Sequence, residues 1–120
     1  MNAFIDFEFN DKNIIVNGSR HKVLDMISIG VCTDNDQSFY AISNEFDVSY
    51  SMNNSWMREN VMCHIYNMYS HLTEHVFSEL AIREIISNVG KSKKQIACDL
   101  YDFFNPHFKS YSSECITELI

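Results

Sequence analysis

The stretch Phe4-Ile5-Asp6-Phe7-Glu8-Phe9 decides the fold prediction for this chain, because charged and apolar side chains alternate along it. Successive side chains of a β-strand point to opposite faces, so Asp6 and Glu8 share one face and the apolar side chains share the other. Two carboxylates about 7 Å apart repel each other, and a divalent cation such as magnesium or manganese is the natural group to lie between them. The alternative interpretation is an amphipathic edge strand with a hydrated acidic face.

Three antiparallel strands are predicted at the start of the chain. The first covers residues 3–9, the second residues 23–32 and the third residues 38–43. Asn17-Gly18 lies between two apolar runs and is a strong hairpin signal, so the first hairpin is expected to turn there.

After Asp47 the spacing of the apolar residues changes from a period of two to a period near that of a helix. A short helix is expected to begin at Trp56. Ser55 and Asn54 are competing candidates for its N-terminal cap, since both side chains can accept a hydrogen bond from a free backbone N–H.

Two longer helices and a fourth strand are expected in the second half. An apolar stripe predicts a helix over residues 72–88, with Gly90 as its stop. Ser92 is predicted to cap a final helix that runs to about Phe104, and residues 107–112 to form a fourth strand. The sequence thus predicts one α/β domain over residues 1–120.

Composition limits the function classes. The net charge of −7 argues against non-specific binding to nucleic acid, although an acidic cleft that holds metal ions can still act on it. The chain has no run of eighteen apolar residues and no signal-peptide pattern, so a cytoplasmic protein without membrane contact is expected. The four cysteines include no Cys-x-x-Cys pair, which argues against zinc. His64, His71 and His75 fall on one helical stripe, which we interpret as a polar helix face.

Four stretches, in this order and spacing, resemble the first half of a DEDD-type 3′–5′ exonuclease with a ribonuclease H-like fold. The resemblance is to bacterial and phage exoribonucleases similar to the mycobacterial 3′–5′ exoribonuclease. It covers about half of the chain. The stretches are Phe4-Ile5-Asp6-Phe7-Glu8-Phe9, Met26-Ile27-Ser28-Ile29-Gly30-Val31, Phe39-Tyr40-Ala41-Ile42-Ser43-Asn44-Glu45-Phe46-Asp47 and Trp56-Met57-Arg58-Glu59-Asn60-Val61.

The resemblance implies a site and partners. Asp6 and Glu8 would bind two magnesium or manganese ions about 4 Å apart, which activate water and stabilise the leaving 3′ oxygen of RNA or single-stranded nucleic acid. Trp56 would flank the substrate cleft and Arg58 would contact phosphate; the alternatives are a core anchor for Trp56 and a solvated surface side chain for Arg58. The family's dimeric members suggest a homodimer.

The chain also departs from the family pattern, since it lacks the family's C-terminal part. Where the family has its second catalytic Asp, in a Tyr-Asp setting, this sequence has Tyr111-Ser112-Ser113-Glu114. Glu114 could replace that Asp only if the strand were shifted by one residue. The family's third motif, a His followed by an Asp, has no counterpart on a later helix.

Three hypotheses stay open. The favoured one is a degenerate exonuclease-like domain that acts as a binding or regulatory protein, encoded by a phage and directed at a host factor. The alternative is an active metal-dependent 3′–5′ exoribonuclease whose site is completed in an unusual way or across a dimer. The third is a fragment of a longer nuclease. Whether the chain is an enzyme is thus undecided by its sequence.

Overall fold

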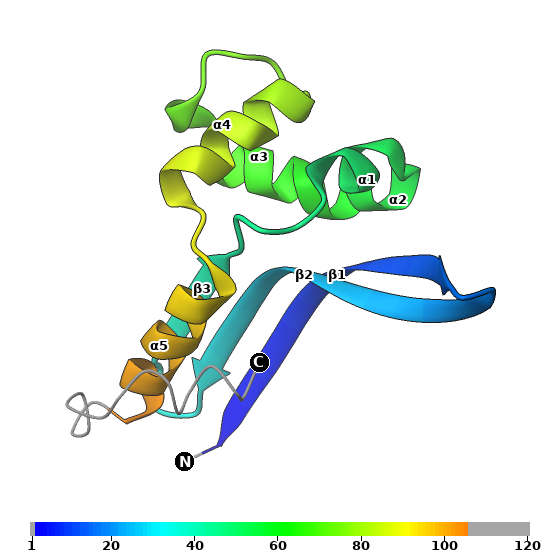
Figure 1. Ribbon diagram of the computed structural model, residues 1–120. Helices are drawn as coiled ribbons and strands as arrows, with labels where there is room; N and C mark the ends of the chain where they lie inside the picture. Colours follow the sequence, from blue (N-terminus) through cyan, green and yellow to red (C-terminus); the bar gives the residue numbers. More distant parts are fainter. Residues whose placement is uncertain (1, 106–120) are drawn as a thin grey trace.

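The computed structural model describes residues 2–105 and shows a mixed α/β fold. One antiparallel three-stranded sheet comes first and helices follow (Figure 1). The predicted fold class, three antiparallel strands and then helices, is therefore confirmed. The predicted fourth strand at residues 107–112 lies outside the described residues.

The sheet has the order β1-β2-β3, with β1 at Ala3–Val16, β2 at Ser19–Thr33 and β3 at Ser38–Ile42. The predicted hairpin turn is confirmed, because Asn17 and Gly18 have φ angles of 52° and 79°. Positive φ at both central residues is the geometry of a type I′ turn. The first two strands are longer than predicted, because the polar residues on either side of the turn also pair across the hairpin.

A register shift between Glu8 and Phe9 marks a β-bulge in the first hairpin. Glu8 pairs with Ser28 and Phe9 with Met26, which leaves Ile27 as the extra residue on β2. Ile27 is fully buried among the helices, whereas its neighbour Met26 packs on the opposite side of the sheet. The bulge therefore puts the consecutive residues Ile27 and Ser28 on the same side of the sheet, since Ser28 pairs with Glu8 on the side where Ile27 is buried.

A small helical lobe begins at α1 (Val48–Asn53), which the Asp47 side chain caps by accepting a hydrogen bond from the N–H of Tyr50. The next helix is continuous and longer than predicted. It runs through α2 (Ser55–Met57), the π-helical turn η1 (Arg58–Met62), α3 (Cys63–Tyr69) and the 3₁₀ turn η2 (Ser70–Leu72). Asn54 caps it rather than Ser55, because the Asn54 side chain accepts from the N–H of Met57.

The expected helix over residues 72–88 is wrong in its first part. The helix α4 spans Glu79–Val89, and Ser78 caps it by accepting from the N–H of Ala81. Thr73 is extended and breaks the helical path, so Val76 is 80% exposed in a loop. The later part is confirmed, and Gly90 follows the last helical residue.

The final predicted helix is confirmed as α5 (Lys93–Phe104), with the Ser92 side chain accepting from the N–H of Gln95. It lies against the sheet on the side opposite the helical lobe (Figure 1). One apolar core joins Ile27 and Ile42 of the sheet to the helical lobe. The other joins Ile29, Val31 and neighbouring residues to α5.

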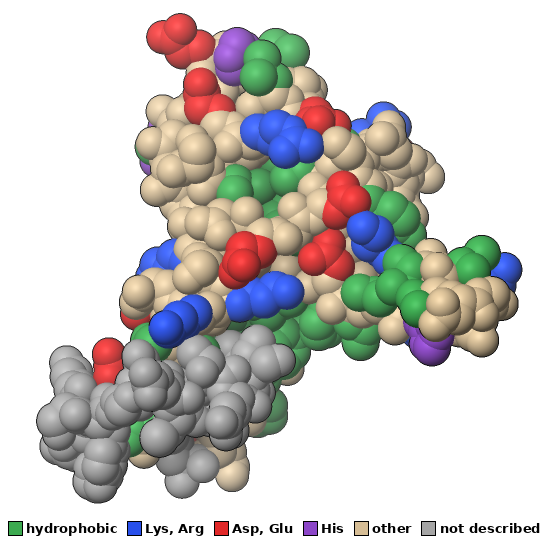
Figure 2. Space-filling model, viewed as in Figure 1, with side chains coloured by type: hydrophobic (Ala, Val, Ile, Leu, Met, Phe, Trp, Pro, Cys, Tyr) green, Lys and Arg blue, Asp and Glu red, His purple; other side chains and the backbone are tan. Residues whose placement is uncertain are grey.

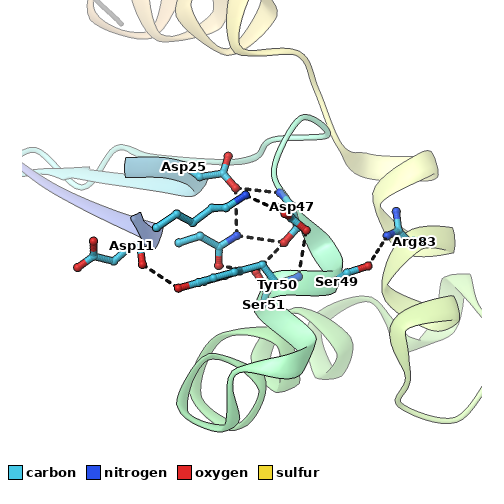
Figure 3. Close-up of polar contacts among 9 residues, drawn as sticks. Asp11, Asp25, Asp47, Ser49, Tyr50, Ser51 and Arg83 are labelled. Carbon is cyan, nitrogen blue, oxygen red and sulfur yellow. Dashed lines mark hydrogen bonds and ion pairs between the residues drawn. The ribbon is translucent and has the colours of Figure 1, made fainter. Parts of the chain in front are cut away.

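A buried polar network ties the hairpin to the helical lobe (Figure 3). Asn10 is fully buried, and its amide nitrogen donates to Asp25 Oδ2 and to the carbonyl of Asp47, both at 3.1 Å. Its amide oxygen accepts from the Ser51 hydroxyl at 2.6 Å. At the rim, the Lys12 ammonium donates to Asp47 Oδ2 at 2.8 Å. Asn10 is thus the point where strand β1 holds helix α1.

Replacing Asn10 by Ala is expected to lower the free energy of unfolding by about 2–3 kcal/mol, because it leaves buried hydrogen-bonding groups without partners. Urea unfolding followed by circular dichroism measures the change. Asn13→Ala is the matched control on the exposed part of the same strand and should alter stability by at most about 0.5 kcal/mol. Equal effects of the two substitutions would contradict a central role for the Asn10 network.

Candidate functional site

The two carboxylates singled out from the sequence line one pocket between the sheet and the helical lobe. Its volume is about 310 Å³. Strand β1 contributes Asp6 and Glu8 to its floor, while the helix that begins with α2 forms the facing wall. The lining residues are Asp6, Glu8, Ser28, Gly30, Tyr40, Asn60, Val61, His64 and Ile65.

The strand register sets the position of each group on the floor. Asp6 pairs with Gly30 of β2, which in turn pairs with Tyr40 of β3. Because Gly30 has no side chain, the row leaves open space between the Asp6 carboxylate and the Tyr40 ring. In the next row Glu8 pairs with Ser28, whose hydroxyl lies on the same face. The floor therefore presents two carboxylates and two hydroxyl groups.

The wall of the pocket brings two further polar side chains to the acidic pair. Asn60 lies in the π-helical turn, and His64 follows it by four residues at the start of α3. Residues four apart share a helix face, and π-helical turns occur often at functional sites. Sequence reasoning placed His64 on a polar helix face but did not connect it with Asp6 and Glu8. The i, i+4 spacing of Asn60 and His64 was the available signal.

Electrostatics in the pocket act on Glu8 and on Tyr40. Partial burial raises the pKa of Glu8 above its ordinary value of 4.5, and the nearby Asp6 carboxylate raises it further, while His64 lowers it. Burial likewise raises the pKa of Tyr40, with a smaller contribution from Glu8. Negative charge on this floor is thus unfavourable unless a positive group compensates it.

The structure does not place Trp56 and Arg58 in the lining of this pocket. The Trp56 side chain is 61% exposed, so its interpretation as a core anchor is wrong. It lies one turn before Asn60, whose amide donates to the Trp56 carbonyl at 3.0 Å, and so stands beside the pocket's helical wall. Arg58 is exposed. It lies two residues after Trp56 in the same helix and therefore on a different helix face.

The acidic pair has the chemistry of a magnesium or manganese site. Mg²⁺ is commonly held by one or two carboxylates, with water or substrate phosphate completing its octahedron. Within residues 2–105, no three His, Cys, Asp or Glu side chains stand close enough together to hold a metal ion.

No family model matches the chain, and no curated protein matches it. In the part of the chain that the structure describes, no helix is long and apolar enough to cross a membrane.

The raised pKa of Glu8 predicts a pH dependence of stability. A carboxyl whose pKa rises on folding favours the folded state when protonated, so its contribution is present below pH 4.5 and is lost as pH rises through the folded-state pKa. The free energy of unfolding of the wild type should therefore fall between pH 4.5 and neutrality, whereas Glu8→Gln has no carboxyl at this position to ionise. The variant should thus gain stability relative to the wild type as pH rises, as measured by urea unfolding at both pH values.

Asp47→Asn is the control of opposite sign. A hydrogen bond from Lys12 lowers the pKa of Asp47 below its ordinary 3.8, so this carboxylate stabilises the fold at neutral pH and loses its effect in acid. The Asp47 variant should be less stable than the wild type at neutral pH, with the difference shrinking as pH falls. Equal pH profiles for the Glu8 variant and the wild type would contradict the prediction for Glu8.

Proposed function

We propose that the pocket of Asp6 and Glu8 binds a divalent cation, Mg²⁺ or Mn²⁺, and that the cation binds a phosphate of RNA or single-stranded nucleic acid. In this proposal the chain is a degenerate or truncated 3′–5′ exonuclease-like domain with a ribonuclease H-like fold. It acts in the cytoplasm as a binding or regulatory protein, with a host protein as its further partner.

One observation carries the cation proposal: both carboxylates lie in a single open pocket where burial and mutual repulsion raise the pKa of Glu8. A cation bound between the two side chains would remove that repulsion. Phosphate oxygens are usual ligands for such a cation, and the Asn60 amide and the His64 imidazole on the facing wall are suited to hydrogen bonds with phosphate. The exposed Trp56 ring beside the wall offers a surface on which a base can stack.

Mn²⁺ binding tests the cation proposal directly. We expect saturable binding by the wild type in isothermal titration calorimetry, and about tenfold or greater weakening in Asp6→Asn and in Glu8→Gln, because each substitution removes a charged oxygen ligand.

Asp11→Asn is the matched control, since Asp11 lies on the same strand in an exposed ion pair with Lys22. It should bind Mn²⁺ as the wild type does. If all three variants bound Mn²⁺ as tightly as the wild type, the pocket would not be the cation site. Circular dichroism establishes that each variant is folded.

The position of His64 in the pocket favours a second candidate function, that of an active 3′–5′ exoribonuclease. An imidazole that faces two carboxylates in one pocket is suited to accept a proton from water. In such a reaction the water oxygen bonds to phosphorus, the bond to the 3′ oxygen breaks, and the water's proton passes to His64. This arrangement would supply the base within the pocket, from an element other than the family's last helix.

Incubation with 3′-tailed RNA and Mn²⁺ tests the second function. If the chain is active, the wild type should shorten RNA from its 3′ end, and Asp6→Asn should not. His64→Gln should lower the rate by about 100-fold or more, because it removes the proton acceptor. His71→Gln, on the exposed 3₁₀ turn, is the matched control and should keep the wild-type rate.

Failure of a folded, Mn²⁺-binding wild type to shorten RNA would reject catalysis and leave the binding role.

A further inference from the structure

Helix α5 covers only part of the three-stranded sheet on its side. It packs on β2 and β3, where Ile96 is fully buried and the centroid of the Phe103 ring lies 5.8 Å from that of Phe39. A helix with its side chains is about 10 Å wide, which is about two strand spacings, so one helix cannot cover a third strand. Strand β1 therefore lies beside α5 rather than beneath it (Figure 1).

A groove of about 450 Å³ follows this uncovered strip between β1 and α5. Its sheet side includes Ile5 and Phe7 of β1, which are 52% and 41% exposed, and Leu24 of β2, which is 57% exposed. Apolar side chains left in water together are unfavourable, and a groove lined by them is typical of a ligand site. The volume of the groove lies within the range of small-molecule sites.

The α5 side of the groove changes from charged to apolar along the helix. Lys93 is the first residue of α5 and Phe104 is its last, and both line the groove, as do Ala97 and Leu100 between them. These residues are three or four apart, so they share one helix face. The groove therefore follows α5 over its 12 residues, which is about 18 Å. One end of the groove presents an ammonium group and the rest presents hydrocarbon.

Lys93 is the only charged side chain among the described residues that line the groove. It is half-buried and forms no ion pair within residues 2–105. By contrast, Lys12, Lys22 and Lys91 each form an ion pair with an aspartate. Figure 2 shows basic side chains in the part of the view where α5 begins. A half-buried cation beside hydrocarbon is stabilised by an anionic partner, so the charge of the groove favours a negative ligand.

We propose that the β1–α5 groove binds a long-chain fatty acid. Its carboxylate accepts hydrogen bonds from the Lys93 ammonium, and its alkyl chain lies between Leu100 and Phe104 on one side and Ile5 and Phe7 on the other. One negative group joined to one hydrocarbon chain matches a groove with one cation at one end and an apolar remainder. A peptide would bring many more polar groups, for which this lining offers few hydrogen-bonding partners.

Isothermal titration calorimetry with dodecanoate tests the proposal on the full chain, at neutral pH and below the concentration at which dodecanoate forms micelles. We expect saturable binding by the wild type. Lys93→Gln should bind about tenfold more weakly, because it loses a charge-assisted hydrogen bond. Lys94→Gln is the matched control: Lys94 is the exposed neighbour of Lys93, lies outside the groove and should leave the affinity unchanged.

Two further titrations separate the carboxylate from the alkyl chain. Dodecanol has the same chain without the carboxylate, so it should bind the wild type about tenfold more weakly and should not distinguish the wild type from Lys93→Gln. Ile5→Glu should weaken dodecanoate binding by about tenfold or more, because it places a negative charge beside the alkyl chain. Val76→Glu, at an exposed apolar residue of the helical lobe, is its matched control and should bind as the wild type does.

Three outcomes overturn the proposal. If a folded wild type binds no dodecanoate, then residues beyond 105 or a second copy of the chain cover the groove, and light scattering distinguishes these two occupants by mass. Equal affinities of the wild type and Lys93→Gln mean that the carboxylate is not held at Lys93. Equal weakening by Ile5→Glu and Val76→Glu means that binding is not specific to the groove. Circular dichroism reports whether each variant is folded. Because the groove shares no side chain with the pocket of Asp6 and Glu8, Mn²⁺ titration of the same samples tests the proposed function separately.

Discussion

The buried amide of Asn10 is the interaction on which the rest of this structure depends. It joins the middle of strand β1 to the first turn of α1, through hydrogen bonds to Asp25, the Asp47 carbonyl and Ser51. The same junction fixes where the helical lobe lies above the sheet and where the hairpin leaves the body. A polar group buried this completely is favourable only when its partners are all in place.

The pocket is a consequence of that junction. On the lobe side of the sheet, Asp6, Gly30 and Tyr40 form one cross-strand row. This row carries polar side chains or none, so no apolar core fills the space above it. The π-helical turn and the start of α3 lie over this row and supply Asn60 and His64. The carboxylates therefore stand between the helical core and solvent, where burial raises the pKa of Glu8 and an added cation would be stabilised.

Local rules were sufficient for several elements. The Asn17-Gly18 turn and the Ser92 cap depend on residues close together in sequence, and both were predicted correctly. The helix expected over residues 72–88 failed because its stripe counted Leu72 and Val76, whereas the Ser78 cap begins α4 later and leaves Val76 in a loop. A competing local hydrogen bond thus outweighed apolar spacing. The continuity of α2, η1 and α3 was also missed, because the π turn has no clear sequence signature.

The sequence by itself determined that Asp6 and Glu8 share one face, because side-chain alternation is a property of any strand. It also determined the hairpin turn, the acidic balance of the chain and the approximate place of α5. Only the tertiary structure decided that His64 and Asn60 face the acidic pair, that Trp56 is exposed beside them, and that the hairpin projects as an arm. These placements depend on how the helical lobe packs on the sheet, through contacts between residues distant in sequence, which no local pattern encodes.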